Sequence, residues 1–156
     1  MKPLNVAVVG ATGLVGQEMV RVLEQRGLPI NSLHLFASDR SAGKRLHFHR
    51  EPLEVQALRG SAFDSIGVAL FSAGADISRQ FSPLIARAGA VVVDNSAAFR
   101  MEPWVPLVVP EVNPDDLAHH KGIIANPNCS TIQMVVALAP LHRVNPIKRI
   151  IVSTYQ

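Results

Sequence analysis

The sequence predicts an α/β domain with a mostly parallel sheet and helices on both of its faces. Apolar residues make up 48% of the 156 residues and charged residues only 17%, and most of the apolar ones are Ala, Val, Leu and Ile. Short runs of branched residues alternate along the chain with longer segments of helical periodicity. This alternation is typical of strands that helices bury on both faces, so we expect one domain over residues 1–156 with a core of its own.

The chain opens with a strand, a turn and a helix. Residues 5–10 form an apolar run that ends at Gly10, and apolar positions then recur at helical spacing until Gly27. A second strand is expected at residues 33–37, and it leads into the polar segment 38–44. These elements predict the strand–helix–strand unit from which parallel sheets are built.

Three further buried strands are predicted at residues 68–71, 91–93 and 123–125, each from a run of apolar, mostly branched residues. A helix is expected at about residues 77–88, between the first two of these strands. Pro83 lies inside that helix and should bend or shorten it, because proline removes a backbone hydrogen-bond donor.

The last third of the chain is predicted from its prolines and its cap residues. Four prolines between residues 102 and 114 indicate an extended crossing, and Asn113 followed by proline and two acids indicates the start of a helix. A last helix is expected at residues 130–138. The branched residues of 149–154 then predict a final strand.

The turn after the first strand carries the first functional pattern. Gly10-Ala-Thr-Gly13-Leu-Val-Gly16 spaces its glycines as GxxGxxG between a strand and a helix. The first glycine allows a sharp turn, the second lets the backbone approach a pyrophosphate, and the third packs helix against strand. The helix N-terminus adds unbonded N–H groups. This context indicates a dinucleotide site in a Rossmann-like domain, although a tight structural turn is the alternative explanation.

The end of the second strand should select the dinucleotide. An NAD-binding domain places a carboxylate there to accept a hydrogen bond from the ribose 2′-hydroxyl, and Asp39 is nearby. However, Ser38, Arg40 and Ser41 offer donors to a 2′-phosphate, and two further cations follow them. We therefore predict NADP as the cofactor and expect Asp39 to point outward. A solvated basic loop is the alternative.

The chain has one cysteine, Cys129, in the segment Asn126-Pro-Asn-Cys-Ser-Thr131. It is expected where a strand meets a helix N-terminus, at the sheet edge that faces the ligand in open α/β folds. The helix dipole favours a thiolate there, which is the nucleophilic form. A lone cysteine is more often a small buried hydrophobe, but this position and its polar neighbours favour a nucleophile. A single cysteine also suits a reducing cytoplasm.

Composition argues against several other classes of protein. The formal charge of +3 is too small and too scattered for a nucleic-acid partner. No segment has the roughly 18 apolar residues of a membrane span, and the N-terminus makes a poor signal peptide. His47 and His49 alternate on a possible strand, but no carboxylate or thiol has the spacing of a further ligand, so no metal site is expected.

Six short motifs follow one another along nearly the whole chain. They are Gly10 to Gly16, Ser38 to Gly43, Phe71 to Gly74, Asp94 to Arg100, Pro110 to Asn113 and Asn126 to Thr131. In this order they resemble the aspartate-semialdehyde dehydrogenases. The resemblance implies reduction of L-aspartyl 4-phosphate by NADPH to the semialdehyde, a cytoplasmic step in the biosynthesis of lysine, threonine and methionine.

The resemblance also implies roles for individual residues. Cys129 would be the catalytic nucleophile, which attacks the acyl phosphate and forms a thioester. Arg100 would hold the substrate phosphate and Gln156 would contact the substrate. Asn128 would orient the reacting carbonyl, with a plain helix cap as the competing explanation. The implied cofactor-binding residues are Gly10, Thr12, Gly13, Leu14, Val15, Ser38, Arg40, Ser41, Ser72, Ala73 and Gly74.

The resemblance covers only part of such an enzyme. Family members continue for roughly as many residues again, in a domain that supplies the acid/base histidine and the dimer interface. We therefore expect poor turnover by this chain, and a homodimer or larger homo-oligomer for a longer protein. Two alternatives stay open: an N-acetyl-glutamyl-phosphate reductase-like enzyme of the same mechanism, and a non-catalytic NADP-binding module.

Overall fold

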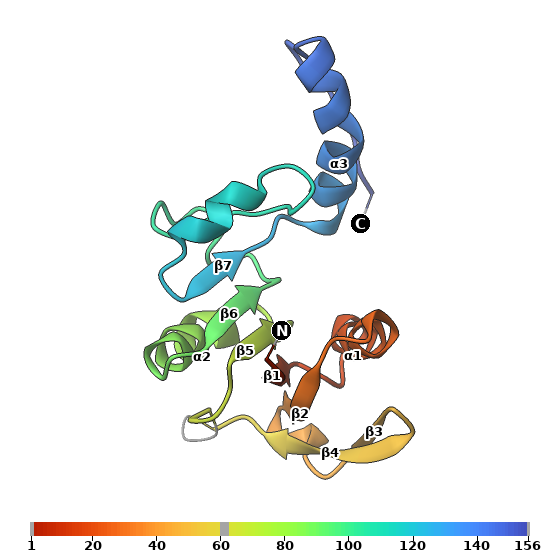
Figure 1. The fold of residues 1–156 in the computed structure, drawn as a ribbon, viewed down its shortest axis with the longest axis vertical. Coiled ribbons are helices and arrows are strands. Elements are labelled where there is room, and N and C mark those ends of the chain that lie inside the picture. Colours follow the sequence, from red (N-terminus) through yellow and green to blue (C-terminus); the bar gives the residue numbers. More distant parts are fainter. Residues whose placement is uncertain (1, 60–62, 156) are drawn as a thin grey trace.

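A twisted sheet runs through the computed structural model, which describes residues 2–59 and 63–155 (Figure 1). Within those residues the sheet has seven strands in the order β3-β4-β2-β1-β5-β6-β7. All neighbouring pairs are parallel except β3 and β4. The strands are β1 (Leu4–Val9), β2 (Ile30–Ala37), β3 (Arg45–Phe48), β4 (Glu51–Ala57), β5 (Val68–Phe71), β6 (Val91–Asp94) and β7 (Ile123–Ala125).

Helices cover both faces of this sheet, as the sequence predicts. Side chains alternate between the two faces of a strand, and on the central strand β1 they enter two different cores. Val6 and Val8 pack in the core beneath α1, whereas Ala7 and Val9 pack in the core beneath α2. The helices are α1 (Leu14–Arg26), α2 (Ala75–Arg87), α3 (Cys129–Val144) and the short 3-10 helices η1 (Asp39–Ser41) and η2 (Pro114–His119).

Two helices continue past an internal proline, although a proline within a helix removes a backbone hydrogen bond. Pro83 does not shorten α2, which continues to Arg87, and α3 runs through Pro140 to Val144. In α2 the buried residues Ser78 and Ile85 lie on either side of Pro83 and hold the helix on the sheet. This packing offsets the hydrogen bond that proline cannot make.

The predicted strand at 149–154 is wrong in this structure. These residues form no regular element and are exposed. A strand requires a neighbour with which to exchange backbone hydrogen bonds, and α3 projects away from the sheet before the chain reaches this segment (Figure 1). The helix expected after Asn113 does begin at Pro114, but as the 3-10 helix η2.

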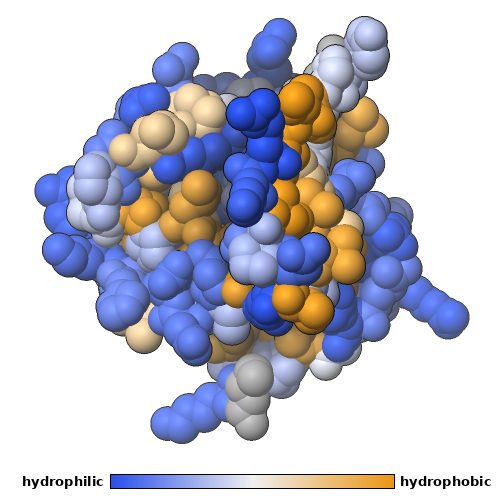
Figure 2. Space-filling view, turned by 90° about the horizontal axis from the view of Figure 1, so that it is seen from above, coloured by the Kyte–Doolittle hydropathy of each residue, from blue (hydrophilic) through white to orange (hydrophobic). Residues whose placement is uncertain are grey.

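The surface around α3 is strongly apolar. α3 has no buried residue, and Leu141 and Val144 are 61% and 88% exposed. Ile151, beyond the helix, is 89% exposed. From above, orange hydrophobic side chains gather beside hydrophilic ones (Figure 2). In the described part of the chain, no helix is both long and apolar enough to cross a bilayer.

The prediction that His47 and His49 lie on one strand is wrong. His47 lies on β3, but His49 lies in the turn to β4 with a positive φ of 50°, beside Arg50 with a φ of 69°. Residues 2–59 and 63–155 contain no group of three or more His, Cys, Asp or Glu side chains placed to hold a metal ion.

Candidate functional site

The turn between β1 and α1 packs more tightly than any side chain would allow. Gly10 has a φ of +86°, and a Cβ built there would lie 2.4 Å from the carbonyl oxygen of Ser72. A Cβ on Gly16 would lie 2.1 Å from the carbonyl oxygen of Gly10. Both positions therefore need glycine for packing alone, one where β1 meets β5 and the other where α1 meets the turn.

Gly13 is different, because nothing inside the chain requires a glycine there. It caps the N-terminus of α1 with φ −76° and ψ 163°, which every residue type adopts readily. A Cβ at Gly13 would meet only the carbonyl oxygen of Gly10, at an ordinary 3.4 Å. The residue is exposed. A missing side chain at an exposed helix N-terminus leaves room for a ligand to approach the backbone, so this turn fits a phosphate group.

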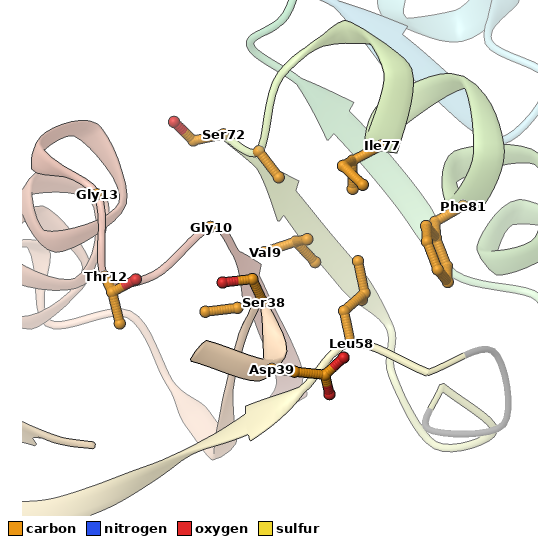
Figure 3. A pocket seen from close by; sticks show the side chains of 12 residues that line it. Val9, Gly10, Thr12, Gly13, Ser38, Asp39, Leu58, Ser72, Ile77 and Phe81 are labelled. Carbon is orange, nitrogen blue, oxygen red and sulfur yellow. The ribbon is translucent and has the colours of Figure 1, made fainter. Parts of the chain in front are cut away.

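A cavity of about 500 Å³ opens beside this turn (Figure 3). One wall is apolar and combines Val9 of β1 with Leu58, which follows β4, and with Ile77 and Phe81 of α2. The opposite edge carries hydroxyl groups and exposed backbone. An apolar slot with a polar edge suits a flat ring joined to a sugar phosphate. The full lining is Val9, Gly10, Thr12, Gly13, Ala37, Ser38, Asp39, Leu58, Ser72, Ala73, Ile77 and Phe81.

Six of the eleven predicted cofactor-binding residues line this cavity: Gly10, Thr12, Gly13, Ser38, Ser72 and Ala73. Leu14 and Val15, the first residues of α1, are 89% and 47% exposed, and their only polar groups are those of the backbone. The first intrahelical bond of α1 runs from Gln17 N–H to Gly13, and the N–H groups before it have no partner within the helix. Gly74 caps α2 next to the lining.

Residues 38–41, from which the sequence predicts the choice of dinucleotide, form η1 and its N-cap at one rim of the cavity. Arg40 and Ser41 directly follow Asp39, which itself lines the cavity. The Asp39 side chain is 85% exposed, and its carboxylate lies 3.4 Å from a guanidinium nitrogen of Arg59. The sequence predicts that Asp39 points outward; its side chain is exposed, but the residue lines the rim of the cavity.

Hydrogen bonds connect the cavity to the cysteine segment along the carboxyl edge of the sheet. The backbone N–H of Ser72 donates to Val9, that of Asn95 to Phe71, and that of Asn126 to Asp94. Each bond joins the residue after one strand to the end of its neighbour. The turn of β1 and the segment that leads to Cys129 therefore lie on one continuous edge, where ligands bind in open α/β sheets.

Cys129 is the first residue of α3 and is exposed, so the predicted position at a helix N-terminus is confirmed. Asn128 is the N-cap: its Oδ1 accepts a hydrogen bond of 2.9 Å from the backbone N–H of Thr131. The capping explanation of Asn128 therefore holds in this structure. Its side-chain NH₂ group is a second, separate functional group. Gln156 lies outside the described residues.

Arg100 lies on the same edge and joins the ends of two strands. Its Nε donates to the carbonyl oxygen of Asn126 at 2.9 Å, and one terminal nitrogen donates to that of Asn95 at 3.1 Å. A guanidinium has five N–H donors, so these two bonds are compatible with an oxyanion contact. The part-buried group is thus held beside the segment that carries Cys129.

The structure locates several residues that sequence patterns alone did not single out. Leu58, Ile77 and Phe81 form the apolar wall of the cavity, and each is an ordinary apolar position in its own segment. Asn95 and Asn126 join their side chains through a 2.8 Å hydrogen bond between Nδ2 of Asn126 and Oδ1 of Asn95. Only their places directly after two neighbouring strands could have indicated this pairing.

Comparison with known proteins identifies the family. Residues 5–120 match the family model described as semialdehyde dehydrogenase, NAD binding domain. The chain is 56% identical over 154 residues to the aspartate-semialdehyde dehydrogenase of Synechocystis sp., an alignment that covers 99% of this chain and 46% of that protein.

Solved structures agree with the sequence comparison. A crystal structure of aspartate semialdehyde dehydrogenase II complexed with ASA, from Vibrio cholerae, has a TM-score of 0.88 and 47% identity and covers 91% of this chain and 47% of the other. That of the Candida albicans enzyme with NADP has a TM-score of 0.80 and 29% identity and covers 94% and 48%. The chain spans a little under half the length of these relatives. The chain belongs to the semialdehyde dehydrogenase family and carries its NAD-binding domain, and the relatives named here are aspartate-semialdehyde dehydrogenases.

Proposed function

We propose that this chain binds NADP and carries the nucleophile for the reductive dephosphorylation of L-aspartyl 4-phosphate to aspartate 4-semialdehyde. The observation that carries the proposal is Gly13, a glycine that neither backbone geometry nor packing requires, at a helix N-terminus that opens on the cavity. Its simplest use is to admit a pyrophosphate. Cys129 lies at a second helix N-terminus on the same sheet edge.

The preference for NADP over NAD rests on the rim of the cavity. Ser38 lines the cavity, and Arg40 and Ser41 follow in η1. A guanidinium and two hydroxyl groups suit the 2′-phosphate of NADP, which carries negative charge and several acceptor oxygens. NADP is also the ligand of the Candida albicans relative at 29% identity.

The chemistry assigned to the chain is acyl transfer to sulfur. The thiolate of Cys129 attacks the acyl carbon, an S–C bond forms, and the C–O bond to phosphate breaks, so that phosphate leaves with the electron pair. Arg100 binds the phosphate oxygens as they gain charge, and the Asn128 side-chain NH₂ donates to the carbonyl oxygen. When bound, NADPH would supply a hydride to the acyl carbon of the thioester, and the sulfur of Cys129 would leave as thiolate when the S–C bond breaks.

Within residues 2–59 and 63–155 we assign no side chain to the proton transfer of the reaction. A positioned acid or base typically contributes about 100- to 10,000-fold to such a rate. We assign that group to polypeptide beyond the half of the relatives' length that the chain spans, together with the contacts of a homodimer or larger assembly. The proposed enzyme acts in the cytoplasm, in amino-acid biosynthesis.

Acyl transfer can be tested on this chain alone, since it precedes the hydride step. The chain is mixed with freshly prepared L-aspartyl 4-phosphate, and intact-protein mass spectrometry follows the adduct. We expect an aspartyl adduct on Cys129 that hydroxylamine removes, with one phosphate released per adduct. Cys129→Ser should give neither product. The same measurement with N-acetyl-glutamyl phosphate separates the two acyl-phosphate reductases.

The absence of any adduct in folded protein that binds NADPH would support the non-catalytic module instead. Cofactor choice is tested separately by calorimetric titration with NADPH and with NADH. Arg40→Ala should weaken NADPH binding by about tenfold, the value of one good ionic hydrogen bond, and leave NADH binding unchanged. Equal loss for both dinucleotides would contradict the assignment of the 2′-phosphate to η1.

A further inference from the structure

Asp94, the last residue of β6, has a carboxylate that is fully buried, with 0% exposure. Within residues 2–59 and 63–155 no ion pair involves it. Its oxygens accept hydrogen bonds from the Ser78 hydroxyl at 2.8 Å and from the backbone N–H and hydroxyl of Ser96 at 3.1 and 2.8 Å. Burying a carboxylate is unfavourable unless such donors surround it, so the buried Asp94 carboxylate requires these hydrogen bonds.

The side of Asp94 that faces α2 is locked in one orientation. The Ser78 hydroxyl has a single proton and donates it to Oδ1 of Asp94. In the buried 3.0 Å contact between the hydroxyls of Ser78 and Ser82, the donor must therefore be Ser82. This chain of two serines comes from the helix that also carries Ile77 and Phe81 of the cavity wall.

The other side of Asp94 shapes the loop that follows β6. The Ser96 hydroxyl donates to Oδ2 of Asp94 and accepts a 3.0 Å hydrogen bond from the backbone N–H of Ala98. One carboxylate thus sets the positions of two backbone N–H groups, directly at Ser96 and through a hydroxyl at Ala98. Arg100 lies two residues beyond Ala98 in the same loop.

The backbone of Asp94 adjoins the two residues whose carbonyl groups hold the Arg100 guanidinium. Those carbonyls belong to Asn95, the residue after Asp94, and to Asn126, whose backbone N–H donates to the Asp94 carbonyl at 3.1 Å. The side chains of Asn95 and Asn126 are also joined by a 2.8 Å hydrogen bond. Both attachment points of Arg100 are therefore next to Asp94 in the sequence or bonded to it.

We propose that Asp94 is a positioning residue for Arg100: its buried carboxylate holds the start of the loop after β6, and this loop aims the guanidinium at an anion on the carboxyl edge of the sheet. The choice of phosphate as that anion rests on the proposed function. If Asp94 had only a structural role, its substitution would lower the stability of the protein, but the Arg100 guanidinium of the folded variant would keep its wild-type hydrogen bonds.

The test uses two variants that remove the hydrogen bonds of Asp94 in different ways. Asp94→Asn keeps the shape but replaces one acceptor oxygen with a donor, so one of the surrounding donors loses its acceptor. Ser96→Ala removes a single hydroxyl and is the milder change, and Ser96→Thr restores a hydroxyl as a rescue. Ile85→Val is the matched control, because Ile85 is buried on α2 at 1% exposure but makes none of these bonds.

Two quantities are measured by ¹H–¹⁵N NMR on folded protein at mildly acidic pH, with the Arg100 Nε–H signal assigned by its loss in Arg100→Lys. The first is the exchange rate of that Nε–H with water, which reports its bond to Asn126. The second is the dissociation constant of inorganic phosphate, from the movement of the same signal. We expect Asp94→Asn and Ser96→Ala to raise both by about tenfold, equivalent to about 1.4 kcal/mol, and Ile85→Val and Ser96→Thr to stay within about twofold of the wild type.

An unchanged exchange rate in folded Ser96→Ala and Asp94→Asn overturns the positioning role. If Asp94→Asn does not fold, Ser96→Ala and its threonine rescue decide the matter alone. A wild-type signal that does not move with phosphate counts against the anion role in the proposed function, while the exchange rate still decides whether Asp94 positions Arg100. The two ideas can therefore fail separately.

Discussion

Replacing Gly13 with alanine separates cofactor binding from folding. The backbone at Gly13 is extended, with φ −76° and ψ 163°, and a Cβ would lie 3.4 Å from its nearest neighbour, the carbonyl oxygen of Gly10. The variant should therefore fold. The added methyl group would occupy the space through which a pyrophosphate approaches the N-terminus of α1.

The expected effect on stability is close to zero because two small terms oppose each other. Glycine is a better helix N-cap than alanine, which costs the variant a few tenths to about 1 kcal/mol. Alanine at a compatible position restricts the unfolded chain and returns about 0.4–1 kcal/mol. The loss of NADP binding should be much larger, at least about tenfold or 1.4 kcal/mol, because a displaced phosphate loses ionic hydrogen bonds to backbone N–H groups.

Gly10→Ala is the contrasting variant. Its Cβ would lie 2.4 Å from the Ser72 carbonyl oxygen at a φ of +86°, so strain and overlap should lower the unfolding free energy by about 1–3 kcal/mol or more. Thermal unfolding by circular dichroism measures stability, and calorimetric titration with NADPH measures affinity. The wild type and both variants are measured in the same buffer.

Folded Gly13→Ala that binds NADPH as tightly as the wild type would contradict a role of Gly13 in cofactor binding. In that case the turn would be structural throughout, and the cavity would require a different ligand. Loss of folding in Gly13→Ala would refute the geometric premise instead, since it would mean that the turn needs glycine at all three of its positions.

Three further outcomes follow from local geometry. Asn128→Ala removes the acceptor for the Thr131 N–H and should lower stability by about 1 kcal/mol in urea unfolding, whereas Asn128→Ser should keep most of it. The hydrogen bond from Arg21 lowers the pKa of Glu18 below its usual 4.5. Any stability that this pair contributes is therefore present above that pH and is lost as the pH falls. Because both groups are exposed to solvent, Glu18→Gln should leave the melting temperature at neutral pH unchanged. Val144→Glu, at a position 88% exposed, should raise solubility without changing the melting temperature.

Elements with strong local signals could be predicted from the sequence. The first helix ends at Gly27, which adopts the left-handed conformation with a φ of 57°, as expected of a glycine at that place. β5 and β7 have the predicted bounds, since each is a buried run between breaking residues. In these segments local preference and burial point to the same structure.

The errors occur where a distant partner decides. Residues 149–154 have the branched composition of a strand, but a strand forms only beside another edge, and nothing in six residues reveals whether that edge is within reach. Pro83 presents the opposite case. Its local cost is visible in the sequence, but the packing of α2 on β6 and β7, which offsets that cost, is not.

The candidate site also contains residues that the sequence predicts and residues that only the fold brings together. The glycine turn was accessible because its three glycines are close in sequence, and each has a separate physical reason. The apolar wall was not, because Leu58, Ile77 and Phe81 come from segments that only the fold brings together. A lone apolar residue on a helix is normally core, and only the cavity that it faces distinguishes it.

Asn128 can cap α3 and present a hydrogen-bond donor with the same side chain. The structure uses its Oδ1 to cap α3 at 2.9 Å from Thr131 N, and that bond fixes the orientation of the amide. Because oxygen and nitrogen occupy opposite sides of one planar group, a cap that holds the oxygen also determines where the NH₂ points. Capping is therefore the means by which Asn128 could present a fixed donor beside Cys129, the next residue. This account requires that Asn128→Asp, which keeps the cap but has no NH₂, retain the stability of the wild type and lose acyl transfer to Cys129.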